Sequence, residues 1–125
     1  MAKILIIDDD PVYTDMTRQR LERVGHTVQV QLGPFGATTT MRDNEFDLII
    51  LDVFMPALSG PDLLGIMRRN YPNATARVLL CSSMDPAPLA SLAQERGADG
   101  SVSKAAQRYE FLDAVNAALA LPKEA

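Results

Sequence analysis

Short apolar runs of strand length recur along the chain and are separated by longer segments. The runs lie at residues 4–7, 28–30, 48–51 and 78–81, and a weaker one surrounds Val102. Apolar runs of this length are typical of β-strands, and the segments between them are long enough for helices. The pattern therefore predicts strands and helices that alternate along the chain.

Two of these segments have the apolar spacing of amphipathic helices. When successive residues are placed about 100° apart, one face of a helix collects Tyr13, Met16, Leu21 and Val24. The apolar residues of 111–119 fall on one face in the same way. We therefore expect both helices to bury these faces against the sheet.

Three further helices are predicted from their ends and composition. Residues 61–70 and 86–96 each begin with proline, which suits a first helical turn, and Gly97 suits the C-terminal cap of the second helix. Residues 36–43 form the weakest predicted helix because their three consecutive threonines are poor helix formers.

The order of the strands follows from their composition. Strict alternation with helices implies a parallel sheet that is covered on both faces. The first, third and fourth runs are continuously apolar, as in fully covered strands, whereas residues 27–31 and 101–103 alternate like half-exposed edges. The predicted fold is a doubly wound α/β domain with a five-stranded parallel sheet in the order 2-1-3-4-5.

Length, charge and cysteine content limit the number of domains, the cellular compartment and the classes of binding partner that we expect. With 125 residues, 47% of them hydrophobic, we interpret residues 1–125 as a single domain with no further domain attached. No apolar run reaches membrane-span length, and the net charge of −4 offers no basic excess for nucleic acid. The single cysteine, Cys81, suits a reducing compartment. We expect a cytoplasmic protein that contacts neither nucleic acid directly nor membrane.

Polar residues follow the predicted strands at their carboxyl ends, where ligands bind in open parallel sheets. Asp8, Asp9 and Asp10 follow the first strand, Asp52 the third, Ser82 the fourth and Lys104 the fifth. Clustered carboxylates raise one another's pKa unless a cation lies among them, and Mg²⁺ prefers such oxygen ligands. The sequence therefore predicts a magnesium site at this edge.

Simpler structural roles compete with this interpretation. Aspartates after a strand are commonly helix caps, and Asp10, which precedes a proline, fits that role better than metal binding. Asp8 and Asp9 taken singly fit it equally well, and Ser82 or Lys104 alone indicates nothing. Their joint placement at one edge favours a functional site.

Four sequence motifs follow one another along the chain. They are ILIIDDDP at residues 4–11, DLIILDVFMP with Ser59 and Gly60 at 47–60, VLLCSS at 78–83, and GADG at 97–100 followed by Lys104. In this order they resemble the motifs of the response-regulator receiver domains of two-component signalling, which have the flavodoxin-like fold of CheY. The resemblance covers essentially the whole chain.

This resemblance implies a set of roles. Asp52 accepts a phosphoryl group from a sensor histidine kinase or phosphotransfer protein and becomes an aspartyl phosphate. The chain catalyses only its own phosphorylation and dephosphorylation, and it signals by binding a downstream protein. Mg²⁺ is held by Asp8, Asp9, Asp52 and the backbone carbonyl of Phe54. Lys104 supplies a second positive charge and Ser82 a hydroxyl that binds the phosphoryl group.

The chain departs from the family pattern at two positions. Ser101 stands where receivers usually carry an aromatic residue on the fifth strand, and Ala105 follows Lys104 where proline is usual. The usual aromatic relay from phosphate to output is therefore missing. The family's output face makes Leu89, Leu92 and Tyr109 candidate contacts, although core burial explains the two leucines equally well.

Two other functions remain open. A constitutive interaction module, which keeps the fold without using phosphorylation, is compatible with Ser101 and Ala105. A flavodoxin-like cofactor binder is disfavoured because no Ser/Thr/Gly-rich loop follows the first strand, and its aspartates repel an anionic phosphate unless a cation intervenes.

Overall fold

The computed structural model describes residues 1–71 and 74–122. Within them strands and helices alternate as the sequence pattern predicts. None of the described helices has the length and apolar character needed to span a membrane. The elements are β1 (Lys3–Ile7), α1 (Pro11–Arg23), β2 (Thr27–Gln31), α2 (Ala37–Asp43), β3 (Leu48–Asp52), α3 (Gly60–Asn70), β4 (Arg77–Ser82), α4 (Pro86–Arg96), β5 (Gly100–Ser103) and α5 (Arg108–Ala120).

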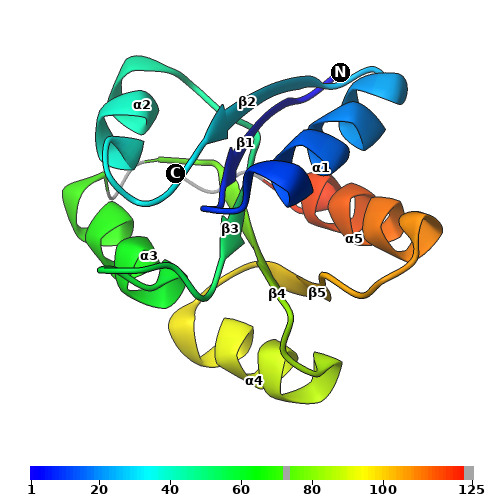
Figure 1. Ribbon diagram of the computed structural model, residues 1–125. Helices are drawn as coiled ribbons and strands as arrows, with labels where there is room; N and C mark the ends of the chain where they lie inside the picture. Colours follow the sequence, from blue (N-terminus) through cyan, green and yellow to red (C-terminus); the bar gives the residue numbers. More distant parts are fainter. Residues whose placement is uncertain (72–73, 123–125) are drawn as a thin grey trace.

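The strands form one parallel sheet in the order β2-β1-β3-β4-β5, which confirms the predicted topology. Helices α1 and α5 lie side by side on one face, and α2, α3 and α4 cover the other (Figure 1). The central strands β3 and β4 are buried along their whole length, whereas β2 and β5 are partly exposed. The edge positions inferred from alternating polarity are therefore correct.

Successive side chains of each central strand point to opposite faces of the sheet and pack into two separate hydrophobic cores. Ile4 and Ile6 pack with the helices of the α1/α5 face, and Leu5 and Ile7 pack with those of the opposite face. Full burial of such side chains stabilises the fold by roughly 1.5–3 kcal/mol each. The sheet is thus packed against helices on both faces, and this packing holds in place the strand ends from which the site loops begin.

The buried face of α1 differs from the predicted one. Met16 and Val24 are 40% and 48% exposed, so placing them in the core was wrong. Thr14 and Thr17 are buried instead, because their hydroxyls donate to the carbonyls of earlier residues and so need no water. In α4, by contrast, Leu89 is fully buried, which makes it a core residue and not a surface contact.

A close approach of the backbone at the start of α3 requires Gly60. A β-carbon at this position would overlap the carbonyl oxygen of Asp52. The amide of Gly60 also donates to the carbonyl of Val53 at 2.9 Å, which ties the loop after β3 to the first turn of α3. Glycine here therefore sets the path of the chain that leaves Asp52.

We expect Gly60→Ala to lower the free energy of unfolding by about 1–3 kcal/mol, because the backbone must shift to relieve the overlap. Gly65→Ala is the matched control, since a β-carbon there meets nothing closer than 3.4 Å. In the interior of α3 that change should stabilise by about 0.5–1 kcal/mol. Urea unfolding of both variants measures the difference, and equal effects would contradict the steric argument.

Candidate functional site

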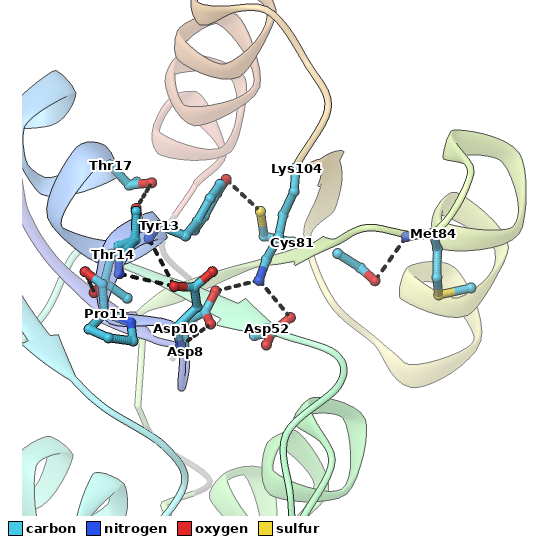
Figure 2. Close-up of polar contacts among 12 residues, drawn as sticks. Asp8, Asp10, Pro11, Tyr13, Thr14, Thr17, Asp52, Cys81, Met84 and Lys104 are labelled. Carbon is cyan, nitrogen blue, oxygen red and sulfur yellow. Dashed lines mark hydrogen bonds and ion pairs between the residues drawn. The ribbon is translucent and has the colours of Figure 1, made fainter.

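The predicted site residues meet at the carboxyl edge of the sheet. Asp52 and Ser82 are the last residues of β3 and β4, Asp8 directly follows β1, and Lys104 directly follows β5. Parallel strands present these ends at the same edge, so residues far apart in sequence come together (Figure 2).

An ammonium group lies between two buried carboxylates at the centre of this cluster. The Lys104 Nζ is 2.9 Å from an oxygen of Asp8 and 3.5 Å from an oxygen of Asp52. Asp8 and Asp52 are only 2% and 4% exposed. Buried carboxylates this close repel each other, and the lysine offsets part of that repulsion.

The cluster perturbs the ionisation of its members. Burial raises the pKa of Asp52 to about 7, the charge of Asp8 adds to this, and Lys104 opposes it. Burial by itself would lower the pKa of Lys104, but the hydrogen bond and charge of Asp8, together with the charge of Asp52, raise it. Lys104 therefore stays protonated at neutral pH, while Asp52 holds a proton more strongly than an ordinary carboxyl does.

A third carboxylate completes an oxygen-rich group. Asp9 is exposed, and one oxygen from each of Asp8, Asp9 and Asp52 lies within 4.8 Å of the others. Oxygen donors of this kind fit a hard divalent cation such as Mg²⁺. Asp10 instead caps α1, because its carboxylate accepts from the amides of the second and third helical residues. The cap predicted for Asp10 is confirmed.

Ser82 is fully buried at the end of β4. Its hydroxyl oxygen accepts from the amide of Met84 at 3.2 Å, and its carbonyl accepts from the amide of Lys104 at 2.8 Å. The loops after β4 and β5 are therefore tied together at this residue. Phe54, two residues beyond Asp52, has a side chain that is 60% exposed.

Sequence reasoning missed two residues that contact the cluster. The Lys104 Nζ lies 4.7 Å from the centre of the Tyr13 ring, and the Tyr13 hydroxyl lies 3.2 Å from the Sγ of Cys81. Burial raises the pKa of Cys81 to about 11, so the thiol stays protonated. The sequence pattern predicts Tyr13 only on the apolar face of its helix. The available signal is its position in the first turn of α1, directly after the aspartates at the carboxyl edge of the sheet.

The two departures from the family pattern lie on the β5 side of the site. Ser101 pairs with Leu80 in the β4–β5 ladder and is partly buried, without a large side chain on the strand. The peptide bond between Lys104 and Ala105 is trans, as are the other described peptide bonds.

Comparisons with known proteins agree with this geometry. Residues 4–116 match the family model described as response regulator receiver domain. The chain is 30% identical over 119 residues to the transcriptional regulator RpaA of Synechocystis, covering 95% of this chain but 49% of that protein. It thus spans about half the length of that relative, and 24% of the length of NtrC from Azospirillum brasilense, to which it is 32% identical over 94% of the chain.

Solved structures give the same picture. The receiver domain of Francisella response regulator 1452 superposes with a TM-score of 0.84 at 26% identity, covering 95% of this chain and 97% of that one. The response regulator TrrA from Thermotoga maritima, solved in complex with Mg²⁺ and BeF, has a TM-score of 0.80 at 25% identity and covers 93% and 97%.

The raised pKa of Asp52 predicts a pH-dependent stability in metal-free buffer. A carboxyl in the unfolded chain titrates near about 3.9, so the folded protein retains a proton that the unfolded chain has lost between that pH and about 7. Stability is therefore lost as pH rises through this window. Asp52→Asn should gain stability over wild type as pH increases from 5 to 8.

Urea unfolding in the presence of a chelator measures this difference. Asp113→Asn, which changes an exposed carboxylate on α5, is the matched control and should follow the wild-type pH dependence. Parallel pH curves for wild type and Asp52→Asn would show that Asp52 is not destabilised by burial and by Asp8.

Proposed function

Because the chain belongs to the response regulator receiver domain family, we propose that it is a phosphorylation switch of a two-component system in which Asp52 accepts the phosphoryl group. The observation that carries this proposal is the pairing of a buried carboxylate with an ammonium group 3.5 Å away, beside two further carboxylates. A buried aspartate with a purely structural role is satisfied by a single cationic or hydrogen-bonding partner. The grouping of Asp52 with an ammonium group and two further carboxylates instead suits a carboxylate whose charge changes when it accepts a phosphoryl group.

Mg²⁺ is the cofactor that the donor set fits. Asp8, Asp9 and Asp52 would hold it together with the backbone carbonyl of Phe54. Bound there, the ion neutralises charge that develops on the transferring phosphoryl oxygens. The carboxylates supply only oxygen, which agrees with the preference of Mg²⁺.

The reaction is a nucleophilic substitution at phosphorus. One oxygen of ionised Asp52 attacks the phosphorus of a phosphohistidine on a sensor kinase or phosphotransfer protein, and the new O–P bond forms as the P–N bond breaks. The departing imidazole keeps the electron pair and takes up a proton. Lys104 neutralises charge beside the acceptor throughout, so its protonated state is required.

Ser82 connects the phosphoryl group to the rest of the domain. Its hydroxyl would donate to a phosphoryl oxygen, and moving toward that oxygen stretches the bond that Met84 now makes to it. The loop from Ser82 to Asp85 leads directly into α4, so it is the first segment to respond. A downstream protein then recognises the altered surface, and the domain is an enzyme only toward its own aspartate.

The cellular compartment and the binding partners of the domain are also part of the proposal. We propose a cytoplasmic domain that contacts neither membrane nor nucleic acid, in keeping with its net charge of −4. DNA binding is stated of relatives such as RpaA and NtrC, which are longer than this chain. The second candidate, a constitutive interaction module, is favoured only by Ser101 and Ala105.

Asp52 should be labelled by a small phosphodonor such as acetyl phosphate in a reaction that requires Mg²⁺. Intact-mass spectrometry should show one added phosphoryl group in wild type, none in Asp52→Asn, and none when a chelator is present. Asp113→Asn should be labelled at the wild-type rate. Unchanged labelling of Asp52→Asn would place the acceptor elsewhere, and no labelling of wild type would favour the constitutive module.

The structural response to phosphorylation should be small and local, because Ser101 offers no ring to move into the space that Ser82 vacates. Amide chemical shifts with and without beryllofluoride should change mainly between Ser82 and Asp85 and around Lys104. Large changes along β5 and α5, from Val102 to Val115, would show that another residue performs the role of the missing aromatic.

A further inference from the structure

Among the described residues, Asp8, Asp52 and Tyr13 contact the ammonium group of Lys104, and they differ in how they respond to a metal ion. Asp8 and Asp52 contact it as negative charges, at 2.9 and 3.5 Å. The third neighbour is the uncharged ring of Tyr13, whose centre is 4.7 Å away. A ring face attracts a cation through its quadrupole and needs no ionised partner.

The Tyr13 ring is held at both ends. Its backbone amide donates to the capping carboxylate of Asp10 at 3.2 Å, which fixes the residue in the first turn of α1. Its hydroxyl contacts the Sγ of Cys81 at 3.2 Å, on the buried strand β4 (Figure 2). Few rotations remain for a side chain held in this way, so the ring is a fixed surface beside the ammonium group of Lys104.

The contacts of Lys104 to the two carboxylates weaken when a cation binds those same oxygens. The ammonium then loses the attraction that orders a long, flexible side chain, and partial exposure to water offers it other positions. The contact to Tyr13 does not share this weakness, because a divalent ion held by carboxylates does not occupy the ring face.

We propose that Tyr13 is a positioning residue that keeps the Lys104 ammonium beside Asp52 while the carboxylates hold Mg²⁺. This inference rests on the proposed function of Asp52 as phosphoryl acceptor, and it assigns the ring, and not the hydroxyl, as the group that acts on Lys104. The hydroxyl and Cys81 serve to keep the ring in place.

Substitutions at Tyr13 separate the ring from the hydroxyl. Tyr13→Leu should slow labelling of Asp52 by acetyl phosphate about three- to tenfold, the loss expected of one cation–π contact. Tyr13→Phe keeps the ring and should stay within about twofold of wild type. Phe35→Leu also replaces an aromatic ring with leucine, at a residue before α2 that is 75% exposed, and should have no effect. Equal slowing by Phe and Leu would overturn the role of the ring.

Proton NMR tests the contact without any phosphorylation. The Cε protons of Lys104 should resonate upfield of those in an unfolded chain, should stay there when Mg²⁺ is added, and should lose the shift in Tyr13→Leu but not in Tyr13→Phe. If Mg²⁺ moves the Lys104 Cε resonances of wild type to their chemical shift in an unfolded chain, the ring does not hold the ammonium group and the inference is wrong. This measurement needs only the wild-type protein, so it decides the question even where Tyr13→Leu does not fold. Failure of wild type to be labelled would instead count against Asp52 as acceptor.

Discussion

The repulsion between two buried carboxylates at one edge of the sheet governs the organisation of this site. Asp8 and Asp52 are nearly inaccessible to water, and parallel strand pairing brings the ends of β1 and β3 together. Water cannot screen their charges, so a cation must do so. Lys104 meets this need from the position directly after the edge strand β5, with its ammonium group 2.9 Å from Asp8 and 3.5 Å from Asp52.

The same repulsion makes the site responsive. Burial, together with the charge of Asp8, raises the pKa of Asp52 to about 7 even beside the ammonium group of Lys104. In the proposed function, a divalent ion adds further positive charge and a phosphoryl group then changes the balance of charges again. That proposal couples stability, metal binding and reactivity through one set of charges, and each proposed step alters the forces on Lys104 and on the loop that begins at Ser82.

In the proposed function, the route from the phosphoryl group to output does not pass through an aromatic ring on β5. Ser101 provides no ring on that strand, and the ring that contacts Lys104 comes from Tyr13 of α1. Tyr13 reaches β4 at Cys81, the residue before Ser82. The role proposed for this aromatic contact is therefore to hold the lysine rather than to move a strand, in line with the predicted response confined to the loops.

The sequence by itself determined the order of elements, the sheet topology and the edge at which Asp8, Asp52, Ser82 and Lys104 gather. Strand periodicity is a local signal, and an alternation of strands and helices leaves few ways to order a parallel sheet. The sequence also predicted the cap at Asp10, which depends only on neighbours in the chain. Only the tertiary structure decided that Met16 faces water, that Leu89 is core, and that Tyr13 lies over Lys104. These outcomes depend on the rotation of each helix against the sheet and on contacts between residues far apart in sequence, which periodicity does not specify.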